Sequence, residues 1–143
     1  MMCISKGITY DCVYAADIIH TYMKILVVDD NNSVTGLLSQ FFKAKGHDCV
    51  TTNSGKKGLA LCLNNKFYAI ILHVAMPDFT GADFLDSLIE AGKIENQKII
   101  VLTALPLGDV KLGDHHHGIC EVLPKPCNLG ALMKTLTSLT AVT

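Results

Sequence analysis

The stretch Lys24-Ile25-Leu26-Val27-Val28-Asp29-Asp30-Asn31-Asn32-Ser33 decides the fold of this chain. The Ile-Leu-Val-Val run predicts a short buried strand, and the asparagine and serine residues after it are typical N-caps of an α-helix. Apolar residues then recur at helical spacing as far as Lys45-Gly46, a pair that commonly ends a helix. The first unit of the chain is therefore a strand followed by a helix.

The same unit recurs along the rest of the chain. Four more strands are predicted, at residues 49–52, 68–72, 98–102 and 119–123. Helices are predicted after Ser54, around residues 84–89, within 107–117 and around residues 129–139. Strands that alternate with helices are typical of a parallel sheet covered on both faces. We therefore predict an α/β domain with a doubly wound, five-stranded parallel sheet.

Composition restricts the classes of function. The 143 residues suit one domain, and the basic residues are twelve lysines with no arginine, against thirteen acids, for a net charge of −1. Direct nucleic-acid binding is not expected, because sequence readers depend on basic patches and arginine forks. No apolar run approaches the roughly 20 residues of a membrane span. Six cysteines without a CxxC pair indicate reduced thiols in a cytoplasmic protein.

Residues 1–22 lie outside the alternation, and we expect them to form an N-terminal extension to a domain of residues 23–143. Tyrosines and isoleucines between Tyr10 and Tyr22 favour a further helix there. Because Met23 stands directly before the first strand, one hypothesis is that the natural chain starts at Met23. Mass spectrometry of the native N-terminus tests this, and a peptide containing residues 10–22 would contradict it.

Side chains that can bind ions or take part in chemistry gather where the predicted strands end. Asp29 and Asp30 follow the first strand, His73 the third, Thr103 the fourth and Lys125 the fifth. In open parallel sheets, ligands bind at the carboxyl ends of the strands. Adjacent carboxylates suit Mg²⁺, and a hydroxyl with an ammonium suits a phosphoryl group. The turn after the first strand lacks the glycines of a dinucleotide or P-loop site.

Four motifs in order resemble the receiver domains of two-component response regulators. They are Lys24 to Asn31, Met76-Pro77 with Gly81, Ile-Val-Leu-Thr103-Ala, and Leu-Pro-Lys125-Pro126. The resemblance covers residues 24 to about 140 and includes the single-domain chemotaxis regulators. It implies a flavodoxin-like (βα)5 fold with strand order 2-1-3-4-5. It also implies a sensor histidine kinase or another phosphorelay protein as the partner, with a chain that is a monomer or weak dimer.

The resemblance also implies a role for each strand-end residue. Asp30 and Asp29 would hold Mg²⁺ with the backbone carbonyl of Ala75. Thr103 would bind and report the phosphoryl group, and Lys125 would pair with the phosphoacceptor.

Two positions depart from the family pattern. The phosphoacceptor aspartate is replaced by His73, and the aromatic residue that couples to Thr103 is replaced by Val122. An acyl phosphate requires a carboxylate nucleophile, and an imidazole removes one anionic oxygen from a site built for a hard cation. We therefore expect weakened Mg²⁺ binding and a receiver that is impaired in, or independent of, phosphorylation and acts by protein–protein binding.

Three interpretations of His73 remain open. It marks a degenerate receiver, which we prefer, or it is itself phosphorylated or binds a transition metal, or it is a laboratory substitution. For the whole chain, one alternative is a small metal-dependent phosphoryl-transfer enzyme using Asp29, Asp30 and His73, and another is a purely structural interaction domain. We do not expect an enzyme, because no further acid or base is visible. The histidines at 115–117 are interpreted as a solvated loop, in a flexible segment of residues 107–118 near the partner-binding face.

Overall fold

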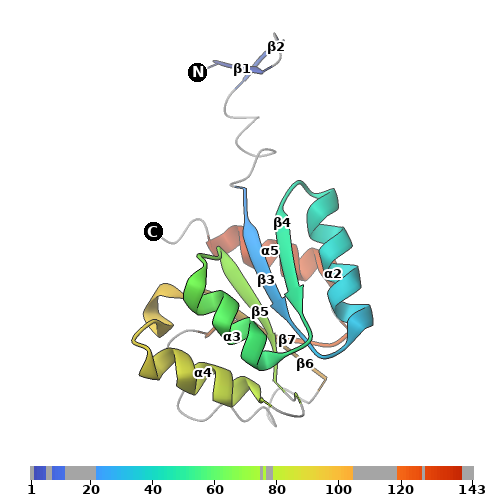
Figure 1. Cartoon of the computed structure of the whole chain (residues 1–143). Helices are drawn as coiled ribbons and strands as arrows, with labels where there is room; N and C mark the ends of the chain where they lie inside the picture. Colours follow the sequence, from blue (N-terminus) through green and yellow to red (C-terminus); the bar gives the residue numbers. More distant parts are fainter. Residues whose placement is uncertain are drawn as a thin grey trace.

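The computed structural model describes residues 2–5, 8–11, 22–74, 76, 79–104, 119–126 and 128–139. Its larger sheet has five parallel strands, in the spatial order β4-β3-β5-β6-β7 (Figure 1). The strands are β3 (Lys24–Val28), β4 (Asp48–Thr52), β5 (Ala69–His73), β6 (Ile99–Thr103) and β7 (Ile119–Pro124). Counted along the chain from β3, this is the order 2-1-3-4-5, so the predicted flavodoxin-like arrangement is confirmed.

Helices cover both faces of the sheet. They are α2 (Asn32–Ala44), α3 (Gly55–Asn64), α4 (Gly81–Glu90) and α5 (Leu129–Ser138), with a short 3-10 turn η1 (Ile94–Asn96). The predicted helix caps are present. The Asn31 and Ser54 side chains accept hydrogen bonds from backbone N–H groups of α2 and α3. The helix predicted within 107–117 lies outside the described residues. No helix in the described part of the chain is long and apolar enough to cross a membrane.

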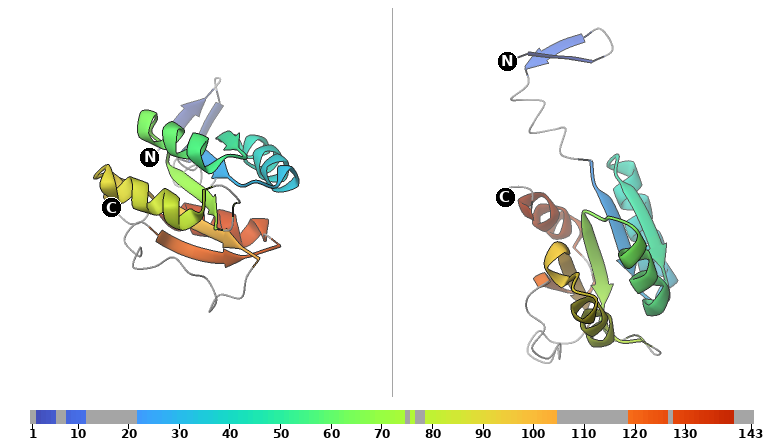
Figure 2. Two further views of the ribbon diagram at one scale, coloured as in Figure 1. Left: turned by 60° about the horizontal axis from the view of Figure 1, so that its bottom comes forward. Right: turned by 60° about the vertical axis from the view of Figure 1, so that its left-hand side comes forward.

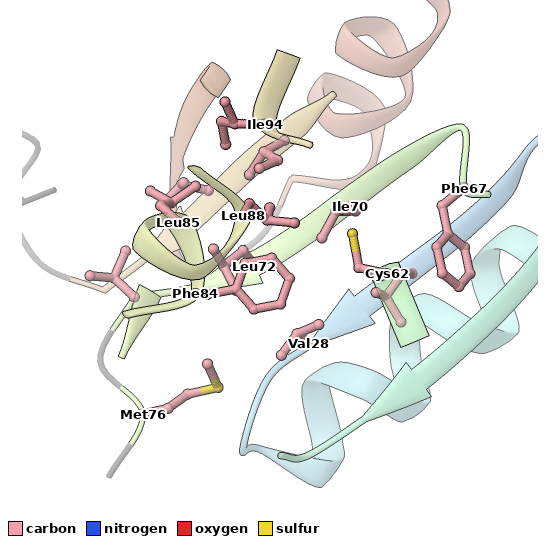
Figure 3. Close-up of a cluster of buried hydrophobic side chains, with 14 residues drawn as sticks. Val28, Cys62, Phe67, Ile70, Leu72, Met76, Phe84, Leu85, Leu88 and Ile94 are labelled. Carbon is pink, nitrogen blue, oxygen red and sulfur yellow. The ribbon is translucent and has the colours of Figure 1, made fainter. Parts of the chain in front are cut away.

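One apolar cluster covers each face of the sheet. Helices α3 and α4 lie on one face of the sheet, and α2 and α5 lie on the other (Figure 2). Apolar side chains of each helix pair belong to the cluster on its own face. Figure 3 shows the first cluster, in which Phe84 and Leu88 of α4 meet Ile70 and Leu72 of β5. Because the central strands have apolar residues on both faces, β3 and β5 are buried along almost their whole length. The strand ends that carry the polar residues are therefore held by a rigid core.

Gly58 allows α3 to approach the end of β3 closely. A Cβ atom added at Gly58 would lie 2.7 Å from Cγ2 of Val28, which is closer than two carbon atoms pack. Val28 is the residue directly before the acid pair. The close contact therefore supports the part of β3 from which the acidic residues project.

The C-terminal end of α5 is bonded to the amino-terminal side of the sheet. The Tyr68 hydroxyl, just before β5, donates to the carbonyl of Leu136 at 2.9 Å. The ammonium of Lys98, just before β6, donates to the carbonyl of Leu139 at 3.5 Å and lies over the Tyr68 ring. These contacts fix the end of α5 that is far from the carboxyl ends of the strands.

Residues 2–5 and 8–11 differ from the helix expected within the first 22 residues. The structure describes two short antiparallel strands there, β1 (Met2–Ser5) and β2 (Ile8–Asp11), which pair only with each other in the described part of the chain. The helix prediction is therefore wrong over these residues. Isoleucine, threonine and tyrosine at positions 8–10 favour extended structure, which explains the strands. Residues 12–21, where the rest of that helix was expected, lie outside the described residues.

Candidate functional site

Asp29 is held in place at the end of β3 by backbone contacts. Its N–H donates to the carbonyl of Thr52 at 3.1 Å, and its own carbonyl accepts the Asn53 side-chain amide at 2.7 Å. Its carboxylate oxygen Oδ1 accepts the N–H of Asn31 at 2.9 Å. Only 2% of the side chain is exposed. The adjacent Asp30 side chain is 38% exposed, so the pair has one buried and one solvated carboxylate.

His73, the last residue of β5, faces both carboxylates. Because β5 pairs with β3 in register, with Leu72 opposite Val28, the next residues on the two strands meet at the same sheet edge. The ring nitrogen Nδ1 lies 3.9 Å from Oδ2 of Asp29, and Nε2 lies 3.7 Å from Oδ1 of Asp30. Both distances exceed a hydrogen bond. Nδ1 is fully buried and has no hydrogen-bond partner among the described residues.

Lys125 forms the shortest contact that the structure gives to either carboxylate. Its ammonium lies 2.7 Å from Oδ2 of Asp29, with 15% of the lysine side chain exposed. A charge-assisted hydrogen bond of this length is among the stronger polar interactions in proteins. The family resemblance implied that Lys125 pairs with residue 73, whereas the observed partner is Asp29. An imidazole offers an ammonium no anionic oxygen, which explains the different partner.

An irregularity in the sheet helps to place Lys125. Ile99 of β6 pairs with Ile119, but the next residue of β6, Ile100, pairs with Glu121, so the register shifts by one residue. After the shift, Thr103 lies opposite Pro124, and the N–H of Lys125 donates to the Thr103 carbonyl at 2.7 Å. Lys125 is thereby positioned at the same sheet edge as Asp29.

The other predicted site residues lie in three places. One is at the carboxyl edge of the sheet, one is within a strand, and one is outside the described residues. Thr103 is the last residue of β6 and is 2% exposed. Val122 lies within β7, partly buried, opposite Val101. Ala75 lies outside the described residues. Sequence reasoning identified Asn31 only as a helix cap and missed its bond to Asp29, and it missed Asn53, which follows the edge strand β4 without any distinctive motif.

The cluster has the donor atoms of a cation site. One ligand atom each from Asp29, Asp30 and His73 lie within 4.8 Å of one another. Two carboxylates suit Mg²⁺, which prefers oxygen ligands in near-ideal octahedral geometry, but the imidazole nitrogen does not. Together with the unbonded Nδ1 and the ammonium already bound to Asp29, this donor set fits Mg²⁺ poorly.

Comparisons with known proteins agree with the fold. Residues 25–137 match the family model of the response regulator receiver domain. The transcriptional regulatory protein CpxR homolog of Haemophilus influenzae is 33% identical over 105 residues, which cover 73% of this chain and 44% of that protein. The chain spans about half the length of such curated relatives.

Solved structures give the same result. Chemotaxis protein CheY4 of Vibrio cholerae superposes with a TM-score of 0.73 at 29% identity, covering 82% of this chain and 98% of that one. Response regulator TrrA of Thermotoga maritima, in complex with Mg²⁺ and BeF, superposes with a TM-score of 0.68 at 25% identity, covering 81% and 97%. Nothing in these comparisons supports the alternative of a metal-dependent phosphoryl-transfer enzyme.

Proposed function

The chain belongs to the family of response regulator receiver domains of two-component systems, and from this premise we propose that it signals by binding a partner protein without carrying phosphate on residue 73. One observation carries the proposal, namely the position of His73 at the carboxyl end of the central strand β5, beside Asp29 and Asp30. In a receiver, this strand end presents the aspartate that becomes phosphorylated. Imidazole cannot form the acyl phosphate that this chemistry requires.

The contact between Lys125 and Asp29 supports the same proposal. The lysine ammonium already has an anionic partner at 2.7 Å, so the described site keeps an ion pair without any phosphoryl group. In this proposal Thr103 and Lys125 retain the positions of phosphate-binding residues, and Val122 replaces the aromatic switch residue. Without an acceptor and without an aromatic readout, we infer that the partner-binding surface does not depend on phosphorylation.

Receiver domains typically bind Mg²⁺. We propose that Asp29, Asp30 and the carbonyl of Ala75 are the corresponding ligands here and that His73 weakens Mg²⁺ binding. The reason is the loss of one anionic oxygen from the ligand set.

Receiver domains interact with histidine kinases and other phosphorelay proteins and are generally not enzymes. We propose a partner of this class for residues 23–143, with residues 1–22 as an extension, and a protein that is a monomer or weak dimer without enzyme activity. We propose no nucleic-acid or membrane contact and a cytoplasmic location. The buried free thiols of Cys49 and Cys62 are consistent with a reducing compartment.

The test is phosphorylation of the parent chain and of its His73→Asp variant. Each is incubated with Mg²⁺ and a small phosphodonor, and intact mass spectrometry at neutral pH measures the gain of a phosphoryl group. We expect a gain only in His73→Asp, which hydroxylamine removes because an acyl phosphate is cleaved by that nucleophile. The variant His73→Asp with Asp30→Asn is the matched control and should gain much less.

Phosphate on the parent chain would overturn the proposal. Stability of that phosphate in alkali, in which an acyl phosphate is hydrolysed, combined with loss in His73→Gln, would identify His73 itself as the acceptor. Phosphate on neither the parent nor His73→Asp would show that the pocket differs from a working receiver at more than residue 73.

A further inference from the structure

We propose that Asp29, Asp30 and His73 form a binding site for a divalent transition metal ion of the Zn²⁺ class and that His73 gives this site its preference over Mg²⁺. The inference uses the same residues as the proposed function. It does not require that the site be inactive toward phosphate, because metal affinity and phosphate acceptance are separate properties.

The three side chains lie near enough to one another to converge on one ion after a local adjustment. Zinc bonds to nitrogen and oxygen of about 2.0–2.2 Å in a tetrahedral site require ligand atoms roughly 3.4 Å apart. The His73 ring nitrogens lie 3.7 Å from Asp30 and 3.9 Å from Asp29. These are two different nitrogens, and one ion can bind only one of them. With Nδ1 as the ligand, the contact to Asp29 has to shorten by about 0.5 Å. The Asp30 oxygen has to move further, because the three ligand atoms lie within 4.8 Å of one another. Asp30 is the partly exposed member, so its side chain has room to make this adjustment.

The donor atoms favour a borderline cation. Imidazole suits Zn²⁺, Cu²⁺ and Ni²⁺, whereas Mg²⁺ prefers oxygen and water. The Nδ1 atom of His73 is buried and has no hydrogen-bond partner in the part of the chain that the structure describes. A buried polar nitrogen without a partner is unfavourable, and coordination of a metal would remove this cost. With Mg²⁺ as the ion, the same nitrogen would remain unsatisfied or become a poor ligand.

Lys125 sets a limit on the affinity of the site. Its ammonium lies 2.7 Å from Oδ2 of Asp29, and a positive charge there repels an incoming cation. Oδ2 retains a second lone pair, so Asp29 can bind a metal while it accepts the bond from Lys125. We therefore expect removal of the ammonium to strengthen metal binding. If the ion pair only held the site together, its removal would weaken metal binding instead.

The experiment measures metal affinities of the full chain. The histidines at 115–117 are first replaced by alanine, so that this triplet does not compete for the metal. In that background Co²⁺ serves as a visible-absorption probe, Zn²⁺ affinity is obtained by displacement of Co²⁺, and Mg²⁺ affinity is measured by calorimetry. A thiolate-to-cobalt absorption band in the near ultraviolet would reveal coordination by a cysteine instead.

Four variants are expected to change metal binding in different ways. His73→Gln and Asp30→Asn should each weaken Zn²⁺ binding at least about tenfold, whereas Lys125→Ala should strengthen it. His73→Asp should reduce the ratio of Zn²⁺ to Mg²⁺ affinity at least about tenfold relative to the parent. Circular dichroism verifies the fold of each variant, and if His73→Gln fails to fold, the solvated Asp30→Asn decides.

Zn²⁺ affinity that His73→Gln and Asp30→Asn both leave unchanged would overturn the proposal, as would a cobalt spectrum dominated by thiolate. The same is true if Mg²⁺ binds the parent as tightly as it binds His73→Asp. These outcomes are distinct from failure of the proposed function, which depends only on whether the parent chain gains phosphate.

Discussion

Replacing Lys125 by methionine removes the counter-ion of a carboxylate that water hardly reaches. The Asp29 side chain is 2% exposed, and its Oδ2 atom accepts the lysine ammonium at 2.7 Å. Methionine keeps most of the length and apolar volume of the lysine side chain, so the substitution mainly tests the charge. We expect the free energy of unfolding to fall.

The magnitude follows from the burial of the two partners. Removing one partner of a fully buried ion pair costs about 3–5 kcal/mol, because the other charge is left uncompensated. Lys125 is 15% exposed, and Asn31 still donates to Asp29, so water and the backbone replace part of the lost interaction. We therefore expect a loss of about 2 kcal/mol. For a chain of this size this is a decrease in Tm of roughly 6–8 °C.

The assay is urea unfolding followed by far-ultraviolet circular dichroism, because the chain has no tryptophan. A double-mutant cycle compares the parent with Lys125→Met, Asp29→Asn and the double variant. The double variant removes both charges, so it should be at least about 1 kcal/mol more stable than Lys125→Met alone. A Lys125→Met variant within about 0.5 kcal/mol of the parent would refute the reasoning, because the pair would then behave as a solvent-exposed one. Strict additivity in the cycle would also contradict it.

Gly58→Ala should lower the free energy of unfolding by about 1–3 kcal/mol, because the new methyl group meets Val28 at 2.7 Å. Gly36→Ala should raise the free energy of unfolding by up to about 1 kcal/mol, because there is open space at its Cβ position in the helix. Urea unfolding of both variants checks this, and equal effects would contradict it. Burial raises the pKa of the Cys49 and Cys62 thiols from 9.0 to about 11. Thiols of the folded protein therefore keep protons that the unfolded chain loses, so stability should decrease as pH rises from 9 towards 11. At pH 8 both should react slowly with a thiol reagent until urea unfolds the chain, as peptide-resolved mass spectrometry can verify; fast labelling of the folded protein would contradict this.

Most of the fold could be predicted because its signals are local. The five strands of the large sheet are apolar runs between turn residues, and Asn31 and Ser54 cap helices where predicted. The first and last residues of a strand are harder to predict from the sequence. Tyr68 has the composition of a strand residue, but it lies just before β5, and its hydroxyl bonds to α5, 68 residues later. Strand order came from the family resemblance, because periodicity identifies a buried face without identifying the neighbouring strand.

The candidate site was predictable in position but not in its contacts. Parallel strands bring their carboxyl ends to one edge, so the approach of His73 to Asp29 and Asp30 followed from the order of motifs. The bond between Lys125 and Asp29 did not, because it depends on the identity of residue 73 and on a one-residue register shift between β6 and β7. A register shift has no reliable local signature, since Ile119 and Glu121 are both compatible with a regular strand.

The contacts of Tyr68 and Lys98 with the last turn of α5 give this helix a pivot. Its opposite end begins at Leu129, four residues after Lys125, which is bonded to Asp29. Because α5 is fixed at its C-terminal end, a small displacement of Lys125 would tilt the helix. The movement of the helix would be largest at its first turn. In this protein an ion pair to Asp29 holds Lys125, so the segment before α5 is anchored to the end of β3.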